Sequence, residues 1–160
     1  MQKERKQMKK TIALLLAVVF LLTAFSGCGG KKKQLEPEAF VQELLSGAIF
    51  TDSLNLLDDP VVPLLYGIDQ ADYSKALVYC GTAATAEEIA VFEAVDDAAA
   101  ERLLKAARER VDHQIEVYKA YGPAQAMTLE NGVVGRTGNT VVVVICADSD
   151  GARKITDQYI

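Results

Sequence analysis

The sequence contains few of the residues that enzymes most often use to hold metals or attack substrates. Its 160 residues include one histidine and three cysteines. A single histidine excludes the usual multi-histidine zinc sites, and the cysteines form no C-x-x-C pair. The glycine-containing stretch 135–139, "GRTGN", lacks the GK[ST] of a P-loop, and no serine stands in a nucleophile elbow. The most readily recognised classes of catalytic site are therefore absent.

The first thirty residues contain much of the hydrophobic excess. Half of all residues are hydrophobic, and no charged residue occurs between positions 11 and 30. A basic segment before an apolar run and small residues is typical of a secretory signal peptide. The alternative is a retained transmembrane helix, since about 20 apolar residues span a bilayer. The strongly apolar part, 12–22, is shorter than that, and residues 26–30 are poor helix formers, which favours cleavage.

Cys28 indicates which kind of cleavage to expect. Ser26 and Gly27 directly before it resemble the lipobox of bacterial lipoprotein signal peptides, although Phe25 stands where leucine is usual. The resemblance implies a cleaved signal peptide, 1–27, and a diacylated Cys28 as the first residue of the mature chain. Two acyl chains give stable attachment to a membrane. We therefore expect membrane lipid as a partner and the outer face of the cytoplasmic membrane as the location.

The mature chain is predicted to hold an acylated cysteine with a flexible tether, 28–37, and a single extracytoplasmic α+β domain, 38–160. The lysines at 31–33 lie either beside the membrane surface or in a solvated linker. Removing residues 1–27 takes away five of the 17 basic and one of the 22 acidic side chains, which leaves a net charge of about −9. Such an acidic domain repels nucleic acid, so we expect no nucleic-acid partner. The sequence predicts no cofactor.

Periodicity and turn residues predict the helices. Pro37 and Gly47 bracket a first helix, and a short helix capped by Asp58 or Asp59 ends at Gly67. A long helix, 98–121, has apolar residues every three or four positions and ends at Gly122. Asp96 and Asp97 are predicted to cap it, and two ion pairs are expected on its surface, Glu101 with Lys105 and Arg108 with Asp112.

Strands are predicted at 75–80, 88–95, 133–136 and 141–146. The segment 88–95 also fits a helix, because Thr85 and Glu88 match a capping box, but its two-sided alternation of apolar residues favours a strand. The resulting fold class is α+β: a mostly antiparallel sheet of about four strands, packed against one long helix, plus a shorter N-terminal helix.

A few residues remain as candidates for chemistry. His113 has Glu109 four residues before it, but its polar neighbours predict an ordinary surface histidine. Cys80 and Cys146 lie at the ends of predicted strands, and could form one disulfide in an exported chain or stay buried as free thiols. The stretch 148–151, "DSDG", lacks later ligands of a calcium loop and is predicted to be a turn. The sequence predicts no catalytic or metal-binding residue.

Four blocks of sequence resemble a family of small lipoprotein domains of unknown function from Gram-positive bacteria. They are "LYGID" at 65–69, "TAEEIAVFEA" at 85–94, "RERVDHQIEVYKAYGPAQ" at 108–125 and "GNTVVVVICAD" at 138–148. The likeness covers residues 38–150 and implies a surface-exposed lipoprotein with a strand at 88–95. It brings no catalytic residues that could be transferred.

The sequence leaves three functions to compare. The first is a membrane-anchored, non-catalytic lipoprotein domain that binds an envelope protein or small ligand, or serves as an accessory. The alternative is a hydrolase-like envelope enzyme that uses scattered carboxylates, such as Glu87, Glu88 and Glu93. The third, a solute-binding transport lipoprotein, is disfavoured, because two lobes around a ligand usually need a longer chain.

Overall fold

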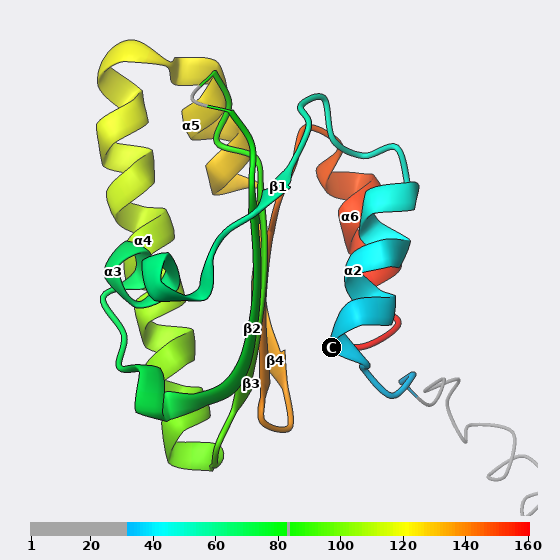
Figure 1. The fold of residues 1–160 in the computed structure, drawn as a ribbon. Helices are drawn as coiled ribbons and strands as arrows, with labels where there is room; N and C mark the ends of the chain where they lie inside the picture. Colours follow the sequence, from blue (N-terminus) through cyan, green and yellow to red (C-terminus); the bar gives the residue numbers. More distant parts are fainter. Residues whose placement is uncertain (1–31, 83) are drawn as a thin grey trace, which may run out of the picture. The chain divides into compact units, whose positions relative to one another are not determined.

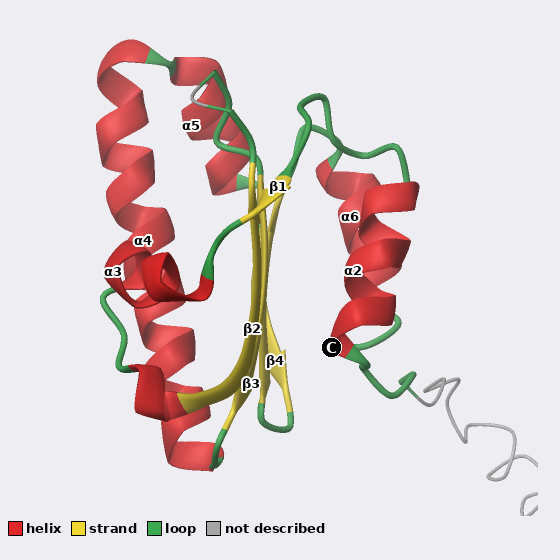
Figure 2. Ribbon diagram, in the orientation of Figure 1, coloured by secondary structure: helices red, strands yellow, loops and turns green. Residues whose placement is uncertain are grey.

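The computed structural model describes residues 32–82 and 84–160, so the predicted signal peptide and Cys28 lie outside the described residues. The described part forms a five-stranded antiparallel sheet with helices on both faces (Figures 1 and 2). The strand order is β1-β2-β3-β5-β4, and every neighbouring pair is antiparallel. The strands are β1 (Asn55–Leu56), β2 (Tyr73–Cys80), β3 (Glu88–Ala94), β4 (Val133–Thr137) and β5 (Thr140–Ile145). The α+β class and the antiparallel sheet are confirmed, with one strand more than predicted.

The structure has more helices than the sequence predicted, and they lie on both faces of the sheet. Three helices cover one face of the sheet: α3 (Val62–Tyr66), α4 (Asp97–Tyr121) and α5 (Pro123–Glu130). Two more, α2 (Pro37–Ser46) and α6 (Ser149–Thr156), cover the other face. The predicted long helix and shorter N-terminal helix are present as α4 and α2, but three further helices pack on the sheet, so no single helix dominates. Each face of the sheet has its own apolar core, which requires helices on both sides.

The centre of the sheet follows directly from the sequence. In β3, Ala90 and Phe92 pack toward α4, while Ile89 and Val91 pack toward α2 and α6. All four are at most 1% exposed, so the strand prediction for this segment is confirmed and the helical alternative is wrong. The neighbouring hairpin of β4 and β5 turns at Gly138, whose positive φ of 52° suits a two-residue loop.

Helix α4 begins where the sequence predicted, because the Asp96 carboxylate accepts a 2.7 Å hydrogen bond from the Ala99 amide. The expected pair of Glu101 with Lys105 is not formed. Lys105 instead lies 2.9 Å from Glu109 and Glu101 lies 3.1 Å from Arg136. Arg136 extends from the edge strand β4 to the first turns of α4, which gives Glu101 a partner that local spacing could not predict. The other predicted pair, Arg108 with Asp112, is also absent among the ion pairs of the described residues.

Two further expectations need correction. The short helix before Gly67 has a 3₁₀ turn, η1 (Asp59–Val61), followed by α3, and no aspartate side chain caps either piece. Asp59 instead accepts a 3.0 Å hydrogen bond from Gln70, just before β2. The "DSDG" stretch is not a plain turn, because Asp148 accepts a 2.9 Å bond from the Gly151 amide and starts α6. No helix of the described residues is long and apolar enough to cross a membrane.

Candidate functional site

Two adjacent buried carboxylates lie where β2 ends and β3 begins. Glu87 and Glu88 are each only 3% exposed, which is unusual for ionisable residues. Their side chains form hydrogen bonds on opposite sides of the sheet, because successive side chains of an extended chain point to alternate faces. Glu87 bonds to the loops that join α2 and α6 to the sheet, whereas Glu88 bonds to side chains of α3 and α4.

The Glu87 carboxylate holds three loops together. One oxygen accepts hydrogen bonds of 3.0 Å from the amides of Thr51 and Ala147. The other accepts bonds of 3.0 Å from the Thr51 amide and 2.7 Å from the Asp52 amide. Both oxygens are therefore occupied by backbone donors of the protein itself. We call this arrangement of the segments 51–52, 87 and 147 the Glu87 junction.

Asp52 extends the Glu87 junction to the loop after β2. Its Oδ2 accepts a 2.7 Å bond from the Thr82 amide and 2.8 Å bonds from the hydroxyls of Thr82 and Thr85. These donors lower the pKa of the Asp52 carboxyl from 3.8 to about 2, with the Thr82 hydroxyl as the largest cause. Gly81 is required beside it, because a Cβ there would lie 2.6 Å from the Thr85 hydroxyl oxygen.

On the other side of the sheet, Glu88 forms a buried ion pair with Arg110 of α4. The guanidinium Nη2 lies 2.6 Å from Glu88 Oε2. The side chain of Arg110 is 15% exposed and that of Glu88 is 5% exposed. The Tyr66 hydroxyl of α3 donates to the other oxygen of Glu88, and the guanidinium lies 5.0 Å from the Tyr66 ring centroid. Cys80 adds a weak contact, with its Sγ 3.6 Å from Glu88. The pair thus joins α3, α4 and the sheet.

The three carboxylates considered for catalysis do not share a site. Glu87 and Glu88 bond to opposite sides of the sheet, and Glu93 lies near the other end of β3, half-buried and 3.8 Å from Lys75. A general acid or base must reach the proton that it transfers. Glu87 and Glu88 are instead enclosed by protein donors, and this arrangement orients loops and helices rather than a reacting group.

The two cysteines lie on different faces of the sheet. Cys80 packs with the α4 core and Cys146 with the α2 and α6 core, and β3 runs between their strands. Both are free thiols. Burial raises the pKa of Cys80 to about 12 and that of Cys146 to about 11, and the charges of Glu88 and Glu87 respectively add to the shift. High pKa values make both thiols poor nucleophiles at neutral pH.

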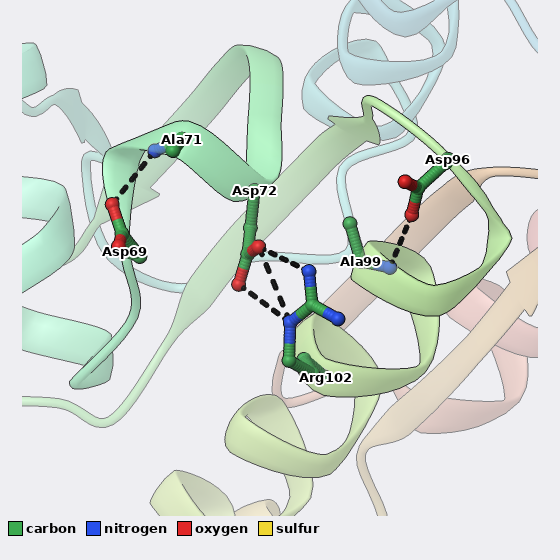
Figure 3. A network of polar contacts seen from close by, with 6 residues as sticks. All are labelled: Asp69, Ala71, Asp72, Asp96, Ala99 and Arg102. Atoms are coloured by element: carbon green, nitrogen blue, oxygen red, sulfur yellow. Dashed lines mark hydrogen bonds and ion pairs between the residues drawn. The ribbon is translucent and has the colours of Figure 1, made fainter.

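His113 is exposed on α4, as predicted for a surface histidine. Elsewhere on that helix, Arg102 binds Asp72, with its Nε 3.1 Å and its Nη2 2.5 Å from the carboxylate (Figure 3). The hydrogen bonds from Arg102 lower the pKa of Asp72.

The surface has two hollows of note. One, of about 250 Å³, lies between α5 and the segment 146–149, and another, of about 210 Å³, adjoins the pair of Arg102 and Asp72. The larger is lined by Ala124, Met127, Thr128, Asn131, Cys146, Ala147 and Ser149.

The sequence named both buried glutamates but not their partners. Arg110 could have been identified from its position directly before Val111, at the edge of the apolar stripe of α4 that packs on the sheet. A guanidinium buried there needs a buried counter-charge. The signal for Glu88 was its register with Ala90 and Phe92, which puts it on the face that α4 covers. Asp52 gave no such signal, because its partners lie thirty residues away in a loop.

The described residues thus form a small α+β domain whose buried carboxylates join its own elements. Residues 53–146 match the family described as a domain of unknown function, DUF4358. The match spans more than half of the chain, and the chain belongs to this family. Comparisons with curated proteins and with solved structures gave no match. The resemblance to a domain family of unknown function is confirmed, while its lipoprotein character stays a prediction.

Proposed function

We propose that this chain is a lipid-anchored domain on the outer face of the cytoplasmic membrane, which binds an envelope protein or a small ligand without catalysing a reaction. The anchoring part is supported by the sequence before Cys28. A basic segment, an uncharged run and the pair Ser26-Gly27 precede that cysteine, in the order of a lipoprotein signal peptide.

The observation that carries the binding part is the closure of the polar network. The carboxylate oxygens of Glu87 and Glu88 are all occupied by donors of the protein, so their role is to fix loops and helices. The 250 Å³ hollow beside α5 stays open to solvent. Met127, one of the residues that line it, is 62% exposed, which leaves an apolar side chain available for contact with a partner.

The anchor is tested by mass spectrometry of the full chain expressed in a Gram-positive host. We expect diacylglycerol on Cys28 and no residue upstream of it. A Cys28→Ala protein should lose both the lipid and membrane retention, while a Cys80→Ala protein, which lacks another thiol, should keep them. A processed Cys28→Ala protein that stays on the membrane would contradict the proposal.

The binding part is tested by photo-crosslinking in the same cells. A crosslinking residue at Thr128, on the 250 Å³ hollow, should give a discrete adduct. The matched control is Asn139, in the hairpin turn at the other end of the sheet (Figure 1). Equal adducts from both positions, or none from Thr128, would count against binding through this hollow. A reaction catalysed by the purified domain and abolished by Glu93→Gln would favour the enzyme alternative instead.

A further inference from the structure

The predicted tether is tied to the folded domain at Lys32 and Lys33, the first residues that the structure describes. The Lys33 amide donates a 2.6 Å hydrogen bond to the carbonyl of Gln158. The Lys32 ammonium donates to the carbonyls of Asp157, at 2.7 Å, and of Ile160. These bonds join residues more than 120 positions apart in the sequence.

The side chain of Lys33 has a binding site of its own. Its Nζ lies 5.2 Å from the centroid of the Tyr159 ring and 3.8 Å from Glu43 of α2. The Tyr159 hydroxyl donates to the same Glu43 carboxylate, and the Tyr159 ring packs edge-on against Phe40 at 5.1 Å. A cation near an aromatic face and a carboxylate is held by both. We call this set of contacts the lysine clamp.

The lysine clamp shortens the free part of the tether. Three residues, Gly29, Gly30 and Lys31, separate Cys28 from Lys32 in the sequence. Four residue steps, even when fully extended, span at most about 14 Å. The ten-residue tether predicted from the sequence would reach more than twice as far.

We infer that the pole of the domain formed by Lys32, Lys33, the start of α2 and residues 157–160 is a membrane-docking surface whose partner is the lipid headgroup layer. The inference rests on the proposed acylation of Cys28. The chain enters the fold at this pole, where the C-terminus also lies (Figure 1). Because four residue steps span at most about 14 Å, this pole is the part of the domain that is held nearest to the bilayer while the clamp is closed.

The same geometry directs the Glu87 junction away from the membrane. Helix α2 runs from the docking pole at Pro37 to Ser46, and its ten residues rise about 15 Å along the axis. The chain then leads to Thr51 and Asp52 at the junction. The lipid-anchored domain therefore presents this junction, and the hollow bordered by Ala147, to the space outside the membrane.

The test uses the acylated full-length mature protein in nanodiscs that contain a lipid with a paramagnetic headgroup. Amide signals of Glu38 and Tyr159 should be lost, while those of Asp52 and Ala147 should be retained. A Lys32→Ala/Lys33→Ala protein, in which the clamp side chains are gone, should lose this contrast. Lys154→Ala, which removes an exposed lysine of α6, should keep it.

The outcomes separate this inference from the anchor. A protein without diacylglycerol on Cys28 would overturn the proposed anchoring, and this inference with it. An acylated protein whose signals are lost evenly, or first at Asp52 and Ala147, would overturn the docking surface alone. In the wild-type protein the Lys33 amide should also exchange with solvent at least about tenfold more slowly than an unstructured amide. Free exchange at Lys33 would overturn the clamp.

Discussion

Arg110 of α4 and Glu88 of β3 form an ion pair with 2.6 Å between Nη2 and Oε2, inside the apolar layer between helix and sheet. Both charges are removed from water, so each depends on the other. The contact also positions α3, because Arg110 lies over the Tyr66 ring and donates to the carbonyl of Leu65. One side chain thereby links the long helix to the short one and to the sheet.

Removing one partner of this buried ion pair is expected to destabilise the fold. Arg110→Leu leaves the Glu88 carboxylate buried without its counter-charge, and the free energy of unfolding should fall by about 3–5 kcal/mol. Urea titration, followed by far-UV circular dichroism, measures this change. The matched control is Lys105→Leu, which breaks the exposed pair with Glu109 on the same helix. Similar losses in the two variants would show that the buried pair has no special role.

Glu87→Gln tests the Glu87 junction. The amide group has one acceptor oxygen where the carboxylate has two, and its NH₂ would face backbone amides that also donate. We expect a loss of at least about 2 kcal/mol, since buried donors are left without acceptors. Hydrogen exchange should become faster at the amides of Thr51 and Ala147. Glu93→Gln, a half-buried glutamate of the same strand, should leave those two amides protected.

The lowered pKa of Asp52 predicts that the stability of the fold depends on pH. Its pKa in the folded protein is about 2, below the ordinary value of 3.8. A carboxyl with a lowered pKa stabilises the fold above the unfolded value, and this contribution is lost as the pH falls through the folded value. The free energy of unfolding should therefore decrease between about pH 4 and pH 2. Asp52→Asn should flatten this decrease, whereas Asp150→Asn on the surface of α6 should not. An unchanged profile for Asp52→Asn would contradict the assignment.

The two thiols should react only when the protein unfolds. With pKa values of about 12 for Cys80 and 11 for Cys146, the thiolate is scarce at pH 8. Iodoacetamide should label neither residue appreciably in the folded domain and both of them in urea, as measured by intact mass. The same spectrum, taken without reductant, should show no intramolecular bridge. A Cys80–Cys146 disulfide would require a different sheet, because β3 separates the two strands.

The central sheet and α4 were predictable because their signals are local. Apolar alternation determines both faces of β3, and a capping aspartate followed by a long apolar stripe identifies α4. Helix α6 was not, because "SDGARKIT" combines turn-forming residues with charges. Eight residues do not form a stable helix alone. Its apolar residues pack against the face of the sheet that it shares with α2, and Ile155 lies near Gly47.

The candidate site was likewise predictable from the sequence only where its signals are local. The burial of Glu88 could be inferred from its register with Phe92, but its pairing with Arg110 depends on how α4 lies across β3. The Glu87 junction joins segments 35 and 60 residues away in the sequence, and no spacing rule connects them. The lysine clamp could not be predicted from composition, since a Gly- and Lys-rich stretch is typical of a free linker.

The second helical layer has a practical consequence. The family match begins at Ser53 and ends at Cys146, so α2 and α6 lie outside it, although they cover one complete face of the sheet. A fragment cut to those limits would expose to water a row of aliphatic side chains: Ile89, Val91, Val142 and Val144. Such a surface favours self-association. Recombinant work on this domain should therefore start no later than Lys32 and retain Ile160, so that both helices and the lysine clamp are kept.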